Sequence, residues 1–205
     1  MNQPDFPALE AELKEHVLDL RRRLLIIDNR FISFDDKIMS CEDIKAIRYG
    51  IMQMLVFHRL KTDKYYRIEL MDNKGNVMKI FFGHSKLSTC DRGREENYDS
   101  IINSLWHAVK KRLVNEALND INSGKPYSAG NCRLKAEGIE LNNCGIFNNR
   151  TYMVPWSDAG KKLGYGKFYV YSKSKPSRKC KINFLRTWNS VVLFSLVEYF
   201  LSKSE

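Results

Sequence analysis

The sequence predicts a mainly β (α+β) protein built from two antiparallel β units, each closed by a C-terminal helix. Short runs in which apolar and polar residues alternate, separated by turn residues, are typical of antiparallel strands. Two stretches near residues 98–121 and 187–201 instead place apolar residues at helical spacing, and each follows a set of strands. A loose internal repeat relates residues 39–50 to residues 154–166. Together these observations indicate one fold that occurs twice in the chain.

The first half opens with an amphipathic segment and then changes to strand periodicity. Apolar residues in 8–22 recur at spacings of three and four, which predicts an N-terminal helical segment within residues 1–22. Residues 72–76 (DNKGN) are a strong turn signal between two alternating runs. The expected strand regions are residues 24–34 as a hairpin, then 37–40, 47–57, 65–70 and 77–82.

A boundary between the halves is expected at the end of the first long helix. Gly124 is a plausible helix stop, and Lys125-Pro126 then interrupts regular structure. The predicted domains are therefore residues 23–124 and residues 125–205. The expected elements of the second half are strand regions 131–136, 138–141, 146–154, 167–171 and 179–184, followed by a helix from about residue 187.

The internal repeat aligns the middle of the two halves. MSCEDIKAIRYG and VPWSDAGKKLGYG each place an Asp (Asp43, Asp158) after a strand end and finish in Tyr-Gly. Each is followed by hairpins and then by a helix that carries Asn-Ser and a Trp. This alignment predicts that Trp106 and Trp188 occupy similar positions and that at least one of them plugs its own sheet.

The order of strands, the Pro-Trp-Ser-Asp turn within residues 154–158 and the closing helix resemble tandem bacterial pleckstrin-homology-like (PH-like) domains. The resemblance covers roughly residues 20–205. It implies two antiparallel β-barrel or β-sandwich domains, each with a C-terminal helix. It also implies a non-catalytic binding or assembly module, because members of that superfold bind peptides, phosphoinositide headgroups or other copies of themselves.

Composition and charge distinguish the two halves. The 205 residues include 43% hydrophobic and 28% charged residues, which is globular composition and excludes a disordered or collagen-like chain. The formal charge is +10, from 34 Lys plus Arg against 24 Asp plus Glu. Residues 125–205 carry 14 basic and 5 acidic side chains, whereas residues 1–124 carry 20 and 19. The excess positive charge therefore belongs to the second half.

Nine of these basic residues lie between positions 161 and 186, and no acid occurs between Asp158 and Glu198. The stretch interleaves Tyr165, Tyr169 and Tyr171. It predicts contact with an anionic lipid surface or an acidic protein. Binding of nucleic acid, with stacking on the tyrosines, is the alternative, and a solubilising strand edge is the third interpretation. The candidate anion-binding residues are Lys161, Lys162, Lys167, Lys173, Lys175, Arg178, Lys179 and Lys181.

The last helix is apolar on more than one side. Burial against its own sheet and the other domain is one interpretation, and a surface for a protein partner or self-association is the other. The candidate partner-surface residues are Trp188, Phe194 and Phe200.

No set of residues with the spacing of a catalytic or metal site stands out, so neither an enzyme nor a cofactor or metal is expected. His84 and Cys90 come nearest to a ligand pair. The five cysteines are widely spaced and form no CxxC pair, which favours reduced thiols. The N-terminal residues lack the pattern of a signal peptide, and a cytoplasmic location is therefore expected.

Overall fold

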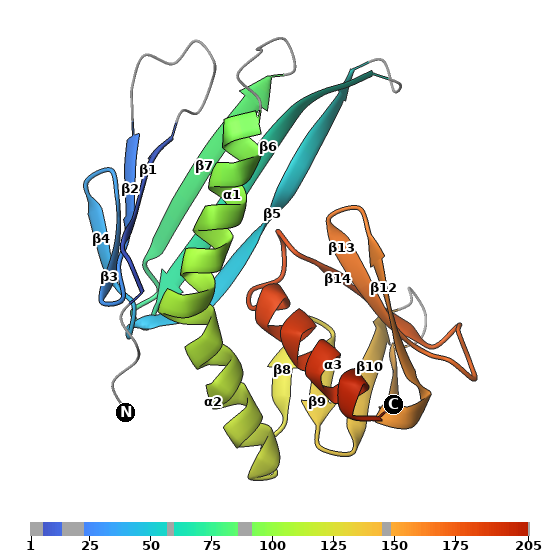
Figure 1. Ribbon diagram of the computed structural model, residues 1–205. Coiled ribbons are helices and arrows are strands. Elements are labelled where there is room, and N and C mark those ends of the chain that lie inside the picture. Colours follow the sequence, from blue (N-terminus) through green and yellow to red (C-terminus); the bar gives the residue numbers. More distant parts are fainter. Residues whose placement is uncertain (1–5, 14–22, 57–59, 86–91, 145–148, 205) are drawn as a thin grey trace. The chain divides into compact units, whose positions relative to one another are not determined.

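The computed structural model describes residues 6–13, 23–56, 60–85, 92–144 and 149–204 (Figure 1). The chain divides into two compact units, residues 1–112 and residues 113–205. Each unit is described by itself below.

Unit 1 contains a four-stranded sheet, a three-stranded sheet and a helix. The four-stranded antiparallel sheet has the order β1(Leu9–Leu13), β2(Arg23–Ile27), β3(Phe31–Phe34), β4(Lys37–Ser40). The three-stranded antiparallel sheet has the order β5(Ile44–Val56), β6(Leu60–Asp72), β7(Val77–Ser85). The helix α1(Arg92–Leu105) follows and continues through a π-helical turn, η1(Trp106–Lys110), into α2(Lys111–Asn122), which belongs to unit 2 from residue 113 onward.

Unit 2 repeats the same order of elements. Its four-stranded sheet contains β8(Tyr127–Ala129), β9(Cys132–Lys135), β10(Gly138–Cys144) and β11(Asn149–Pro155), paired in sequence order. A short 3-10 helix, η2(Trp156–Asp158), leads to the three-stranded sheet β12(Ala159–Gly164), β13(Lys167–Ser172), β14(Lys179–Asn183). The helix α3(Ser190–Ser204) follows. The described part of the chain is therefore mainly β, as the sequence predicts, and none of its four sheets closes on itself.

Backbone hydrogen bonds support the repeat at its aspartates. In unit 1 the carbonyl of Asp43 accepts the N–H of Asn73 at 2.9 Å, which ties the turn between the two sheets to the β6–β7 hairpin. In unit 2 the carbonyl of Asp158 accepts the N–H of Lys173 at 2.7 Å and ties the equivalent turn to the β13–β14 hairpin. Asp43 and Asp158 therefore hold the same place in the two units.

Strand register changes the predicted alignment of the two Tyr-Gly pairs. Gly50 on β5 pairs with Arg67, five residues before the hairpin residue Asp72. Gly164 on β12 pairs with Lys167, five residues before Ser172, the residue equivalent to Asp72. The counterpart of Gly50 is thus Gly164 and not the expected Gly166, which lies in the following turn with φ of +60°.

The residue that plugs unit 2 is Trp156 and not Trp188. Trp156 is buried, and its ring stacks on Phe200 of α3 with centroids 4.7 Å apart and planes at 8°. Its indole N–H donates to the carbonyl of Lys135 at 3.1 Å. Trp188 is half-buried in the turn before α3, whereas Trp106 lies well inside the first helix, so the two tryptophans are not equivalent.

In unit 1 the helix also reaches the turn between the sheets. The Arg112 Nη2 donates to the carbonyls of Cys41 and Ile44, at 3.0 and 2.5 Å. In unit 2 the ring of Phe200 on α3 stacks on Trp156 of the turn. The closing helix of each unit is therefore tied to the chain where it passes from one sheet to the other.

The prediction of an N-terminal helical segment is wrong for the residues that the structure describes. Residues 9–13 form β1, paired antiparallel with β2, and residues 14–22 lie outside the described part. Ala11 and Leu13 are buried while Glu10 and Glu12 are exposed. The physical reason is that this alternation fits a sheet face as well as the helical spacing does, and pairing with β2 decides between them.

The division between the units falls inside the long helix, before residue 113, and not after its end at residue 124 where the sequence places it. The helix is not interrupted there because residues 105–122 contain neither Pro nor Gly. Gly124, with φ of +84°, does follow its last turn. In the described residues no helix is long and apolar enough to cross a membrane.

Candidate functional site

Four of the predicted cations gather with two tyrosines on one face of the three-stranded sheet of unit 2. Strand pairing places Lys162, Tyr169 and Lys181 side by side in one row. The next row contains Gly160, Tyr171 and Lys179. We call this surface the basic face, and its residues are Lys162, Lys167, Tyr169, Tyr171, Lys179 and Lys181.

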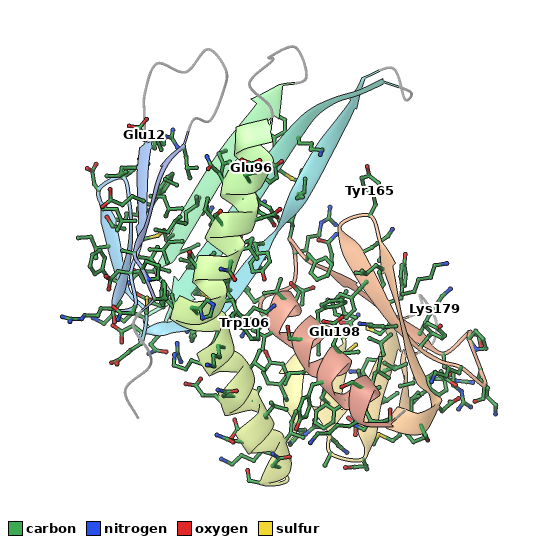
Figure 2. All side chains as sticks on the ribbon, in the orientation of Figure 1. Glu12, Glu96, Trp106, Tyr165, Lys179 and Glu198 are labelled. Carbon is green, nitrogen blue, oxygen red and sulfur yellow. The ribbon has the colours of Figure 1, made fainter. Side chains whose placement is uncertain are left out.

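The basic face points away from the core of unit 2. Alternate residues of the same strands, including Phe168, Val170 and Ile182, are buried and supply the core side of the sheet. Figure 2 shows Lys179 on the opposite side of this sheet from Glu198 of α3. Because side chains alternate along a strand, burial of one set places the cations and tyrosines outward.

Both tyrosine rings of the basic face lean over glycines of β12. A Cβ built on Gly160 would lie 2.8 Å from Cζ of Tyr171, and one built on Gly164 would lie 3.4 Å from Cε2 of Tyr169. The far end of each ring is thus close to the backbone of the neighbouring strand. The Tyr171 ring fits there because position 160 has no side chain, whereas a Cβ at position 164 would only touch Tyr169.

The cations of the basic face have no described carboxylate as a partner. Lys162, Lys167, Lys179 and Lys181 form no ion pair with another residue in the described ranges. The Nζ of Lys167 lies 5.8 Å from the centroid of the Tyr169 ring. The face therefore combines positive charge with aromatic surface.

The other four predicted cations lie elsewhere. Lys161 faces the opposite side of β12, where it forms an ion pair with Glu198 and lies 5.1 Å from the centroid of the Phe194 ring. Arg178 covers the ring of Tyr152 at 4.7 Å. Lys173 and Lys175 are exposed in the β13–β14 turn. One charged run in the sequence therefore separates into four places, partly because successive residues of a strand point to opposite faces.

Asp158 holds the hairpin that carries β13 and β14. Its carboxylate accepts the hydroxyl of Ser172 at 2.5 Å, and the N–H and the hydroxyl of Ser174 at 2.7 and 2.9 Å. The hydrogen bonds from Ser172 and from the Ser174 N–H hold the pKa of Asp158 below its ordinary value. The charged carboxylate therefore fixes the geometry of this hairpin.

The equivalent face of unit 1 keeps the cations but adds an acid. Arg48, Glu69 and Lys79 form the row equivalent to Lys162, Tyr169 and Lys181. Arg67 holds the place of Lys167 in the adjacent row. Three cationic positions thus recur in the two units, while the central position is Glu69 in one and Tyr169 in the other.

Glu69 binds the arginines of its own face. Its side chain is fully buried and pairs with Arg48, while Arg67 donates to its other oxygen at 3.0 Å from Nε and 2.5 Å from Nη2. Burial alone would raise the pKa of Glu69, but the hydrogen bonds and charges of Arg67 and Arg48 together outweigh it and hold the pKa below its ordinary value. In unit 1 Glu69 therefore pairs with two of the three cationic positions, whereas unit 2 has no acid at the equivalent place.

Of the three candidate partner-surface residues near the last helix, Phe200 is buried against Trp156. Phe194 is half-buried and packs edge-on against Phe168, with ring centroids 5.1 Å apart. Trp188 is also half-buried. The helix is apolar on more than one side because it contacts both the inter-sheet turn and the core face of β12–β14.

Sequence reasoning missed the two glycines of the basic face. Gly160, Lys162 and Gly164 alternate along β12, which places them on one side of the strand. This alternation, next to a strand with the pattern Tyr-x-Tyr, is the sequence feature that could have indicated the glycines. Its meaning depends on register, which the sequence did not supply.

The described residues contain no group of three His, Cys, Asp or Glu side chains that could hold a metal ion. The side chains of His84 and Cys90 lie outside the described part. Cys41 is buried, and burial raises the pKa of its thiol to about 12. A thiol held neutral in this way packs as a small apolar side chain.

No protein family model, curated protein or solved structure matches this chain.

Proposed function

We propose that the protein is a non-catalytic binding module of tandem PH-like type, and that its second unit binds phosphate-bearing polyanions through the basic face. The repeated order of four strands, three strands and a helix supports the PH-like assignment. Its two sheets per unit correspond to the sandwich that such domains use. The closing helix of each unit, tied to the turn between its sheets, agrees with the same assignment.

The observation that carries the binding proposal is the exchange of Glu69 for Tyr169 between equivalent faces. In unit 1 a buried acid pairs with Arg48 and Arg67. In unit 2 the same three cationic positions surround an aromatic ring. Cations that no acid of their own face neutralises attract anionic groups, at about 1 kcal/mol for each Lys or Arg near a charged surface.

Charge reversal on the basic face tests this proposal. We expect the double variant Lys162→Glu/Lys181→Glu to weaken binding to polyphosphate and to mixed phosphatidylserine–phosphatidylcholine vesicles at least about tenfold. Lys37→Glu/Lys74→Glu is the matched control, because it makes the same change in net charge at exposed positions of unit 1. The variant Lys173→Glu/Lys175→Glu tests whether the β13–β14 turn contributes to binding as well as the basic face.

Sedimentation with vesicles and fluorescence anisotropy with labelled polyphosphate, over a salt series, provide the measurement. Wild-type protein that binds neither probe at low salt would contradict the proposal. An equal loss in the unit 1 control would attribute binding to net charge alone and would also contradict it.

We propose self-association as the second candidate, through the β12–β13 turn. The side chains of Leu163 and Tyr165 at the β12–β13 turn are 61% and 71% exposed. Figure 2 shows Tyr165 projecting from the end of this hairpin. We expect Leu163→Ser/Tyr165→Ser to abolish any concentration-dependent dimer seen by sedimentation velocity. A dimer that persists in this variant would place the contact elsewhere.

A further inference from the structure

We propose that the basic face binds single-stranded nucleic acid, with one base stacked on Tyr169 and the next on Tyr171. This inference rests on the proposed polyanion binding and names its ligand class. It depends on three features of the face: the spacing of the rings, the position of each lysine and the partial exposure of the rings.

The two rings repeat at a step that suits an unstacked strand. Tyr169 and Tyr171 are two residues apart on β13 and point to the same side, which separates them by about 6.7 Å along the strand. That is about twice the ~3.4 Å rise along the helix axis for each nucleotide of one strand in a duplex. Bases at this spacing cannot remain stacked on each other, so the matching ligand is extended and single-stranded.

Each ring has a lysine directly across on β14. Lys181 pairs with Tyr169 and Lys179 pairs with Tyr171 in the strand register. Lys162 lies on the other side of Tyr169, on β12. One ring and at least one cation thus recur at each step, as one base and one phosphate recur along a nucleic acid.

The rings lie beside the glycines of β12. The far end of the Tyr171 ring is next to Gly160, and Cε2 of Tyr169 is next to Gly164. Both tyrosines are half-buried, which leaves part of each ring exposed to solvent. Inorganic polyphosphate would use the lysines but has no group that stacks on such a ring, whereas a base stacks on it.

Ring removal on the intact chain tests the inference. Stacking contributes roughly 1–3 kcal/mol for each base, so the double variant Tyr169→Leu/Tyr171→Leu should weaken binding to labelled oligodeoxythymidylate about 30-fold or more. The matched control Tyr169→Phe/Tyr171→Phe keeps both rings and should bind within about twofold of wild type. Binding is followed by fluorescence anisotropy, and thermal melting confirms that each variant is folded.

Three further probes separate this inference from the proposed function on which it rests. Inorganic polyphosphate and anionic vesicles carry charge without bases, and their binding should change less than about twofold in the Tyr→Leu double variant. The duplex of the same oligonucleotide with oligodeoxyadenylate should bind more weakly than the single strand. If the probes without bases bind and the Tyr→Leu variant binds oligodeoxythymidylate as wild type does, stacking is overturned and the proposed function stands. If no polyanion binds the wild-type protein at low salt, both the stacking inference and the proposed function are overturned.

Photocrosslinking of wild-type protein provides a test that does not depend on a variant's folding. Ultraviolet irradiation of the complex with oligodeoxythymidylate, followed by mass spectrometry, should place the crosslink on the peptide that contains Tyr169 and Tyr171. A crosslink confined to unit 1, or a duplex that binds as tightly as the single strand, would overturn the inference.

Discussion

Glu69 decides the character of the unit 1 face by itself. Its carboxylate is fully buried, and each of its oxygens accepts a hydrogen bond from a different arginine. Removing one member of such a cluster leaves like charges close together, which is more costly than the cluster's net contribution to stability. The residue therefore holds Arg48 and Arg67 together on the unit 1 face.

Neutralisation of Glu69 should destabilise the protein. We expect Glu69→Gln to lower the free energy of unfolding by about 2–3 kcal/mol, since charged hydrogen bonds are lost while Arg48 and Arg67 remain partly exposed to water. Glu198→Gln, which removes an exposed pair with Lys161, is the control and should cost less than about 1 kcal/mol. Urea denaturation measures both, and equal losses would contradict a special role for Glu69.

The pH dependence of stability follows from the same side chain. Because the pKa of Glu69 is lower in the folded protein than in the unfolded chain, its contribution is present above its unfolded pKa of about 4.3. This contribution is lost as the pH falls through the folded value. Melting curves between neutral and acidic pH should show this loss in wild type and a smaller one in Glu69→Gln. If the melting temperatures of the two proteins fell equally with decreasing pH, Glu69 would not be the source of this loss.

At the scale of elements, the turn between the two sheets is where each unit is held together. In unit 2 this turn is η2, which places Trp156 against Phe200 and directs the carboxylate of Asp158 to the β13–β14 hairpin. One three-residue segment therefore connects the four-stranded sheet, the three-stranded sheet and α3. Changes here should affect the whole unit.

Removal of the Trp156 ring should be costly. We expect Trp156→Ala to lower the free energy of unfolding by about 3–5 kcal/mol, as for other buried large aromatic residues. Trp156→Phe keeps the stacking but loses the hydrogen bond to the Lys135 carbonyl, and should cost about 1–2 kcal/mol. Trp188→Ala serves as the comparison, because its half-buried ring should cost less than that of Trp156. A larger loss at Trp188 in urea denaturation would contradict the placement of the plug.

Loss of the Asp158 carboxylate should loosen one hairpin. In Asp158→Ala the N–H of Ser174 loses its acceptor, so its amide should exchange with solvent faster. Amides of β9 and β10 provide the internal control and should keep their wild-type rates. Hydrogen exchange read by mass spectrometry makes the comparison. Unchanged exchange in the β13–β14 turn would show that Asp158 does not hold it.

At the scale of the molecule, the two units are one design with different charge on one face. Asp43 and Asp158 are equivalent and align the two units. In this alignment Tyr169 pairs with Lys162 in the same place where Glu69 pairs with Arg48. The central positions Glu69 and Tyr169 differ in charge, and unit 1 also has Met71 and Val77 where unit 2 has Tyr171 and Lys179.

A single substitution should convert the second face to the first. In Tyr169→Glu the new carboxylate lies between Lys162 and Lys181, so we expect polyanion binding to fall at least about tenfold with little change in melting temperature. Met153→Glu, which introduces the same charge at an exposed position on another sheet of unit 2, is the control for net charge. Anisotropy titrations measure both, and an equal effect of the two variants would contradict the special position of Tyr169.

Salt dependence gives the number of cations in contact. If Lys162, Lys167, Lys179 and Lys181 all meet phosphates of a single strand, log Kobs should fall against log salt with a slope of about −3. The variant Lys162→Glu/Lys181→Glu should reduce the magnitude of that slope. A wild-type slope near zero would contradict phosphate contacts by this face.

The sequence by itself determined what depends on local pattern. Alternation and turn residues predicted the mainly β character, the closing helices and the repeat, and the acid-free run located the positive charge in the second half. The segment at residues 9–13 was assigned wrongly because its apolar residues satisfy two periods at once, and pairing with β2 selected the strand.

Tertiary structure decided which residues meet. The run from Lys161 to Lys181 looks uniform along the chain, yet strand alternation directs Lys161 to Glu198 and Lys162 to the basic face. The pairing of Lys162 with Tyr169, and of Arg48 with Glu69, is fixed by register between strands, which composition does not encode. The sequence therefore determined how much charge unit 2 carries, and only the fold determined that this charge lies beside aromatic rings with no acid among them.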